Sequence, residues 1–209
     1  MSGFQTIFEI QQSMTVNNRR VVGQQIARSG YLTVAQYLTA VPWVFTVVPH
    51  NYLYYPQVRD IIQTIDNKDR QLPETIIFNS SNLSWFTKYQ GDVVTPVFTL
   101  ASTPTPNTQT LSMNVTSGAG YAFRAGDFCM VGGYTYKVTQ DVLRGTGVAS
   151  VPIHRPLIGT PSSGATVYVG NDCSFNVVAE RCPTYTLNPM TDGAFVQWDE
   201  AFVFREDIT

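Results

Sequence analysis

The side chains that could act as nucleophiles, bases or metal ligands are few in this sequence. Its two histidines are His50, which follows Pro49, and His154, which precedes Arg155. Neither has another histidine, a cysteine or a carboxylate at the spacing of a metal site, so we predict that both lie at the surface or at strand ends. A Ser-His-Asp or Cys-His group, which assembles in space, stays open as an alternative, although the sequence has no G-x-S-x-G motif.

The acidic residues offer candidates for an acid/base pair, but no pattern selects one. The candidates in the second half of the chain are Asp127, Asp141, Asp192, Asp199, Glu200, Glu206 and Asp207. Asp199 and Glu200 are adjacent in a predicted strand, so their side chains point to opposite faces and make a poor pair. The sequence has no P-loop and no G-x-G-x-x-G motif, and Gly118-Ala-Gly120 is predicted to open a strand rather than a phosphate-binding helix. We therefore predict a protein that is not an enzyme, with no catalytic, cofactor-binding or metal-binding residues.

The three cysteines, Cys129, Cys173 and Cys182, form neither a metal-site spacing nor an even set for disulfides. We predict reduced thiols that are mostly buried, because free cysteine is among the most buried residue types. A bridge between Cys173 and Cys182 is an alternative that no pattern favours.

Aromatic residues flank a predicted helix and suggest another kind of chemistry, the stacking of sugar rings. Aromatic residues in strands more often pack in a core or an interface, and we favour that interpretation. A receptor-binding or carbohydrate-binding module is the alternative. The residues concerned are Tyr52, Tyr54, Tyr55, Trp85, Phe86 and Tyr89.

Composition narrows the classes of function. Of the 209 residues, 44% are hydrophobic and only 13% are charged, and the net charge is −2. This charge excludes the basic surface that grips nucleic-acid phosphates. A surface of neutral hydrogen-bonding groups suits subunits that pack on one another, because such groups cost less to desolvate than ions. The start of the chain resembles no secretory signal, and no apolar run approaches the ~18 residues of a membrane span, so we expect folding in a cytoplasm.

The elements that must position these residues are mainly strands. Period-two alternation predicts a strand over residues 4–11, and further strands are expected over 21–27 and within the stretch 31–53, broken by Pro42 and Pro49. The one convincing helix spans 56–67, where an apolar stripe repeats at helical spacing. That stripe consists of Val58, Ile61, Ile62 and Ile65.

A second β-module is expected in the middle of the chain. Residues 74–78 and 84–89 are predicted strands, and the Thr/Pro-rich segment 101–110 is a linker or long loop. Short strands cut by glycine turns follow, and Gly132-Gly133 is a strong hairpin signal. The expected strands are 111–115, 127–131, 134–142, 149–154, 166–169 and 174–179.

The C-terminal segment 194–204 alternates, with Val196, Trp198, Phe202 and Phe204 on one face and Glu200 interrupting it. Glu200 is expected to meet a partner inside the chain, such as Arg59, or a basic residue of a neighbouring subunit. The strand is expected to pair with 4–11 or 43–48. The predicted fold is thus an outer β-barrel or sandwich domain, residues 1–95 plus 185–209, with one packed helix and an inserted small β-module, residues 96–184.

One block of this sequence, residues 123–157, resembles a module of tail proteins from long-tailed bacteriophages. The resemblance is carried by Ala125-Gly-Asp-Phe128, the Gly132-Gly133 turn, Tyr136-x-Val-Thr-x-Asp141, Gly145-x-Gly-x-Ala149 and Arg155-Pro-Leu157. It covers about 35 residues, and elsewhere only the order of elements is similar. The N-terminal stretch lacks the Gly-Arg-Trp element of some members.

The resemblance implies a distal-tail or baseplate-ring subunit, a virion structural protein that rings the end of the tail tube and links it to tip components. Its partners would be itself in a ring, with six-fold symmetry expected, and other tube, hub or baseplate proteins. DNA would only pass through the channel, and no membrane segment is expected. The protein would be assembled in the host cytoplasm and reside in the virion tail. The matching residues form turns and strands, so no catalytic role is implied.

Overall fold

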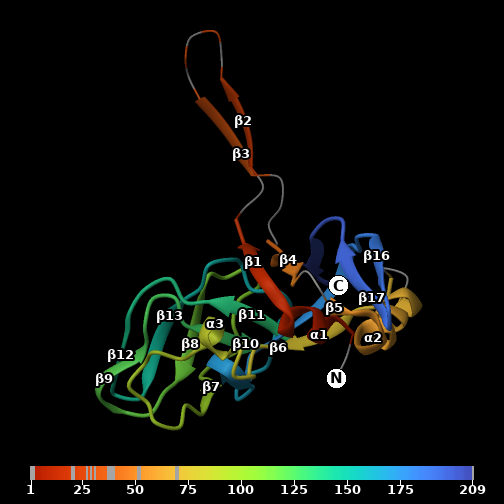
Figure 1. The fold of residues 1–209 in the computed structure, drawn as a ribbon. Helices are drawn as coiled ribbons and strands as arrows, with labels where there is room; N and C mark the ends of the chain where they lie inside the picture. The colour runs from red at the N-terminus through yellow and green to blue at the C-terminus, as the bar shows by residue number, and fades with distance from the viewer. Residues whose placement is uncertain are drawn as a thin grey trace.

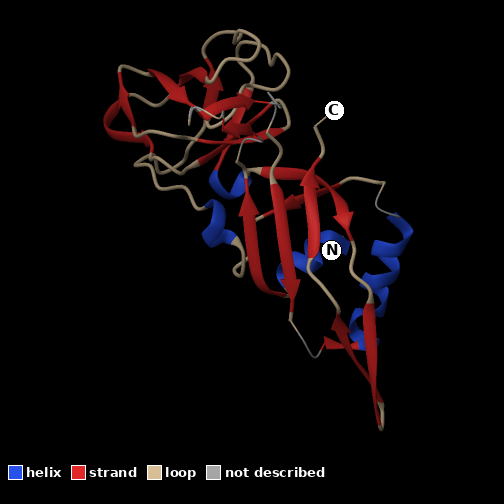
Figure 2. Cartoon of the chain, turned by 90° about the horizontal axis from the view of Figure 1, so that it is seen from above, coloured by secondary structure: helices blue, strands red, loops and turns tan. Residues whose placement is uncertain are grey.

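The computed structural model describes residues 3–19, 22–26, 28, 30, 32–36, 41–50, 53–68 and 71–208. Tyr52 and parts of the predicted strand-rich stretch 31–53 lie outside these ranges. The chain is mainly β, as the sequence predicts, and its strands form two β-rich lobes that lie side by side (Figures 1 and 2). Every pairing between the described strands that belong to a common sheet is antiparallel.

The first lobe, the outer lobe, is built on a five-stranded sheet. In spatial order its strands are β1 (Gln11–Asn17), β4 (Val44–Pro49), β18 (Phe202–Glu206), β15 (Ser174–Arg181) and β6 (Glu74–Ile77). Its core is rich in fully buried aromatic side chains, among them Phe8, Phe45 and Phe204. A three-stranded sheet of β16 (Tyr185–Met190), β17 (Gly193–Trp198) and β5 (Leu53–Tyr54) adjoins it.

The second lobe, the inserted lobe, has its own core, formed by buried residues between Val93 and Val169. Its six-stranded sheet has the order β11 (Tyr134–Lys137), β10 (Phe128–Val131), β14 (Thr166–Val169), β7 (Phe98–Leu100), β8 (Thr110–Asn114) and β13 (Val148–Pro152). The pair β12 (Val142–Gly145) and β9 (Gly118–Phe123) completes it. The expected strand over 134–142 is therefore two strands.

The Gly132-Gly133 hairpin is confirmed. Both glycines have positive φ, +63° and +85°, and the flanking Val131 and Tyr134 face each other across β10 and β11. A two-residue hairpin loop of this kind needs left-handed backbone at both positions, which glycine adopts without a steric penalty.

The strand at 174–179 lies elsewhere than expected. The sequence placed it in the inserted module, but β15 pairs with β18 and with β6 and so belongs to the outer lobe. The reason is its alternation: Phe175, Val177 and Ala179 are buried against the aromatic core of the outer lobe, with which they share one face of the sheet.

The predicted helix at 56–67 is confirmed as α2 (Tyr55–Lys68). Its residues Val58, Ile62 and Ile65 are buried, while Ile61 is half-buried. Figure 2 shows helices beside the outer lobe and at the junction of the two lobes. In the described part of the chain, no helix has the length and apolar character to cross a membrane.

The predicted strand at 4–11 is wrong, because residues Gly3–Glu9 form the helix α1. Phe4, Ile7 and Phe8 are all fully buried, which fits helical spacing and not alternation. Glu74, the first residue of β6, caps the start of this helix: its Oε1 accepts the backbone N–H groups of Phe4 and Gln5 at 3.0 and 3.2 Å. A carboxylate at this end satisfies orphan N–H donors and complements the helix dipole.

The predicted strand at 84–89 is also wrong, because Ser84–Thr87 form the short helix α3. The turn before it explains the difference: the carbonyl oxygen of Ser80 accepts the N–H groups of Leu83 and Ser84 at 3.2 and 2.8 Å. This hydrogen bonding starts a helical turn before the aromatic pair Trp85 and Phe86.

The C-terminal alternation 194–204 belongs to two strands rather than one. β17 pairs with β16 and β5, and after a bend β18 enters the five-stranded sheet. β18 pairs with β4, with Phe204 opposite Phe45, so the predicted pairing with 43–48 is confirmed and that with 4–11 is wrong. Glu200 lies in the bend and binds Arg181 at 2.7 Å, so its partner is inside the chain but is not Arg59.

Between β1 and β4 in the chain, a further hairpin is formed by β2 (Val22–Ile26) and β3 (Leu32–Gln36). Figure 1 shows this hairpin standing clear of both lobes. We call it the arm, residues 22–36. Ile26, at the end of β2, is 74% exposed.

Candidate functional site

The two histidines lie where the sequence predicts, one exposed and one at the end of a strand. His50 is exposed after β4, and its backbone N–H donates to the carbonyl oxygen of Ile10. His154 follows β13, its Nδ1 accepts the N–H of Lys137 at 3.0 Å, and its ring lies 4.9 Å from that of Trp43. Within the described ranges, no three histidine, cysteine or acidic side chains come together in a way that could hold a metal ion.

Most of the candidate sugar-stacking aromatics are engaged within the chain. The hydroxyl of Tyr54 donates to the carbonyl oxygen of Asp192, and that of Tyr89 donates to Ala122. Burial raises the pKa of Tyr89 to about 12. Tyr55 and Phe86 pack against apolar clusters, so among the described candidates only Trp85, at 62% exposed, presents its ring to solvent.

The carboxylates of the resemblance block organise turns. Asp127 is buried, and its two oxygens accept the N–H groups of Gln90 and Arg124, each at 2.8 Å. Burial raises the pKa of Asp127. Asp141 accepts the N–H of Ala125 at 2.8 Å, and this bond with the Arg124 ion pair lowers its pKa. Both carboxylates therefore hold the backbone of neighbouring turns in place.

Asp199 and Glu200 are kept apart by separate partners. Asp199 accepts the hydroxyl groups of Thr184 and Thr186 at 2.6 and 3.3 Å. Glu200 forms the exposed ion pair with Arg181. The two carboxylates therefore bind different partners within the chain.

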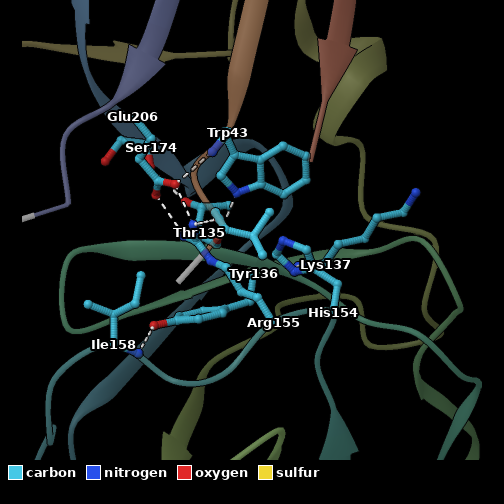
Figure 3. A network of polar contacts seen from close by, with 10 residues as sticks. Trp43, Thr135, Tyr136, Lys137, His154, Arg155, Ile158, Ser174 and Glu206 are labelled. Carbon is cyan, nitrogen blue, oxygen red and sulfur yellow. Dashed lines mark hydrogen bonds and ion pairs between the residues drawn. The ribbon is translucent and has the colours of Figure 1, made fainter. Parts of the chain in front are cut away.

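A buried polar cluster joins the two lobes (Figure 3). Arg155 follows β13 of the inserted lobe and is 0% exposed, and Glu206 ends β18 of the outer lobe and is 4% exposed. The guanidinium donates to both carboxylate oxygens, at 2.5 and 2.7 Å. Such a bidentate pair is stronger and more directional than a neutral hydrogen bond.

Backbone groups from both lobes complete this cluster. Arg155 also donates to the carbonyl oxygens of Val41 and Thr135 at 2.5 and 2.9 Å. Trp43 donates its backbone N–H to Glu206 at 3.0 Å and its indole N–H to Thr135 at 2.8 Å. The two buried charges are thus paired and further hydrogen-bonded, which is the condition under which a protein tolerates them.

Tyr136 forms the floor of the cluster on the inserted-lobe side. Its ring centroid lies 5.1 Å from the Arg155 guanidinium carbon, within the range of a cation–π contact. Its hydroxyl oxygen accepts the N–H of Ile158 at 3.0 Å, and burial raises its pKa to about 12. The phenol therefore stays neutral and leaves Glu206 as the partner of the arginine.

Sequence reasoning missed this Arg155–Glu206 cluster, since 51 residues separate the two partners. One signal was available: Arg155 stands directly before Pro156, among short apolar strands, in a chain with few charges. The cluster ties one lobe to the other through direct hydrogen bonds.

Thiol reactivity provides a direct check of the cysteine placement. Cys129 and Cys173 are buried and Cys182 is half-buried, and all three are free thiols. Burial raises the pKa of Cys129 to about 12 and that of Cys173 well above its usual value. Because the thiolate is the reactive form, both should stay inert to a disulfide reagent at mildly alkaline pH.

We therefore expect one reactive thiol in the native protein, Cys182, and three after unfolding. The thiols are counted with Ellman's reagent from the absorbance of the released product. Cys182→Ser should remove the signal of the native protein. A total of one thiol in denaturant would instead reveal the Cys173–Cys182 bridge and contradict the structure.

Comparisons with known proteins add no relative. A scan against models of protein families finds no match to this chain, and a search of curated proteins finds none either.

Proposed function

We propose that this chain is a virion structural protein that forms a ring at the distal end of a phage tail tube or in the baseplate, linking the tube to tip components. The chain would assemble in the host cytoplasm and reside in the virion tail. The resemblance of residues 123–157 suggests this role, and the structure supplies features that support it.

The arm is the observation that carries the proposal. Its two strands stand clear of both lobes (Figure 1). Its exposed Ile26 would be covered if the arm lay on a neighbouring copy. An element that gains burial only through a partner is typical of an assembly subunit, and a repeated heterologous contact closes into a ring when the rotation allows it.

The other support is rigidity with little surface charge. The buried Arg155–Glu206 pair fixes the lobes on each other, as a subunit of a mechanical assembly requires. A chain with 13% charged residues also costs little to desolvate where copies pack.

Electron microscopy and native mass spectrometry of the purified full chain test the ring. We expect six-fold class averages and a hexamer mass, and Ile26→Asp should weaken assembly about tenfold or more, because it places a charge in an apolar contact. Leu72→Asp, at a residue that is 57% exposed outside the arm, is the matched control and should assemble normally. Three-fold or unsymmetrical particles, or an Ile26→Asp variant that assembles like the parent, would contradict the proposal.

A further inference from the structure

A polar groove lies on the outer lobe, away from the Arg155–Glu206 cluster. Its volume is about 440 Å³, and its lining comes from the end of α1, the start of β1, the end of β4 and the turn before α3. The lining residues with amide, carboxylate or aromatic side chains are Glu9, Gln11, Gln12, His50, Asn82 and Trp85. Apart from Glu9, their side chains are amide, imidazole and indole groups, and no lysine or arginine is among the described residues that line the groove.

Trp85 provides a fixed aromatic surface in this groove. Its indole N–H donates to the carbonyl oxygen of Asn82 at 2.8 Å, and its ring meets Phe86 edge to face at 5.9 Å. Phe86 itself packs against the aromatic core. The Trp85 ring is therefore held in one orientation although it is 62% exposed, and a fixed exposed ring loses little entropy when a ligand stacks on it.

Gln11 also lines the groove. Its Oε1 atom is buried and has no hydrogen-bond partner among the described residues. An unmade hydrogen bond at a buried amide oxygen is costly, so a rotation of the Gln11 side chain that lets its amide exchange hydrogen bonds with a ligand hydroxyl group would be favoured.

A β-bulge directs the neighbouring side chain. Gln11 lies opposite Pro49 and Ser13 lies opposite Val48, so Gln12 is an extra residue in β1. Bulges of this kind re-aim side chains, and Gln12 is exposed at the groove. On the other side, Glu9 is held by hydrogen bonds from Ser80 and Gln5, at 2.9 and 3.1 Å.

From these features we infer that the groove binds a hexopyranose unit of a neutral glycan. The apolar face of a sugar ring stacks on an indole, and its hydroxyl groups exchange hydrogen bonds with amides and a carboxylate. The single fixed charge, on Glu9, disfavours phosphate and other anions. The inference goes beyond the ring subunit and does not depend on it, since the groove lies wholly within one chain.

The experiment is a saccharide titration of the full chain labelled with ¹⁵N. The sequence has three tryptophans, so three indole N–H signals appear, and Trp85→Phe identifies the one from Trp85. The probes are glucose, galactose, N-acetylglucosamine and the disaccharides maltose, lactose and chitobiose, each to about 50 mM. We expect the Trp85 signal to shift saturably with at least one probe, with a Kd on the order of 1 mM, while buried Trp43 stays unchanged.

Matched variants assign the effect to the groove. Trp85→Ala should raise the Kd about tenfold, as measured from the backbone amide signals. Trp85→Phe should keep most of the affinity because it keeps an aromatic face. Gln11→Ala should raise the Kd about fivefold through the lost hydrogen bond. Tyr168→Ala, at an aromatic residue that is 50% exposed on the inserted lobe, is the control and should leave the Kd unchanged.

Three results would overturn the inferred glycan site. They are that no probe shifts the Trp85 signal, that the signal of Trp198 shifts in its place, or that Trp85→Ala binds as tightly as the parent. None of these results bears on ring formation, which is measured separately by particle mass.

Discussion

Arg155→Met is expected to lower the free energy of unfolding by about 3–5 kcal/mol, because the change leaves the Glu206 carboxylate buried without its cation. The carbonyl oxygens of Val41 and Thr135 lose a donor as well. Urea unfolding monitored by tryptophan fluorescence measures this loss of stability, since Trp43 lies within the cluster.

Two further variants separate the buried pair from an ordinary ion pair. Arg205→Met breaks the Arg205–Glu180 pair, which has a similar 2.8 Å contact but is 43% and 47% exposed, and should cost less than about 1 kcal/mol. Arg155→Met combined with Glu206→Leu should be more stable than Arg155→Met alone, because it removes the stranded charge. An Arg155→Met variant no less stable than Arg205→Met would refute the role assigned to the buried pair.

Removal of residues 200–209 is expected to abolish folding of the outer lobe, not merely to weaken assembly. The deletion takes away β18, which lies in the middle of the five-stranded sheet between β4 and β15. Phe202 and Phe204 are fully buried, and burying such a side chain stabilises by roughly 1.5–3 kcal/mol. Two of them, with the ladder bonds of a central strand, approach the whole stability of a typical domain.

Near-ultraviolet circular dichroism and limited proteolysis measure this loss. A shorter deletion, residues 208–209, is the control and should leave both signals intact. A chain without 200–209 that stays soluble, with an unchanged melting transition, would show that β18 is dispensable.

The fold could be predicted from the sequence where local signals decide the structure. The α2 helix follows from an apolar stripe, and the Gly132-Gly133 hairpin follows from turn chemistry. The segment of α1 satisfied two periods at once, since Phe4 and Phe8 fit alternation as well as helical spacing. Contacts with Glu74, about seventy residues away, select the helix, and no local pattern contains them.

The candidate sites could be predicted less well than the fold, because each is formed by residues that are far apart in the sequence. The Arg155–Glu206 pair requires the end of β18 to meet the residue after β13, which only the packing of the two lobes specifies. For the groove, the sequence singled out Trp85 as an aromatic candidate. It could not place Gln11 beside Trp85, because their proximity follows from α1, β1 and α3 converging on one surface.

The inserted lobe leaves and rejoins the outer lobe at a single point, and this has an evolutionary consequence. Ile77, which ends β6, and Ser174, which begins β15, are direct partners in the ladder. The chain between them starts and ends side by side in the host sheet, so residues 93–169, which form the core of the inserted lobe, are an exchangeable cassette, whereas Phe78 and Phe86 stay with the aromatic core of the outer lobe. The Arg155–Glu206 cluster imposes one condition on such an exchange. A replacement lobe must supply a cationic side chain that pairs with Glu206, or Glu206 must be replaced together with the original lobe. Recombination among related genes should therefore conserve or discard Arg155 and Glu206 together.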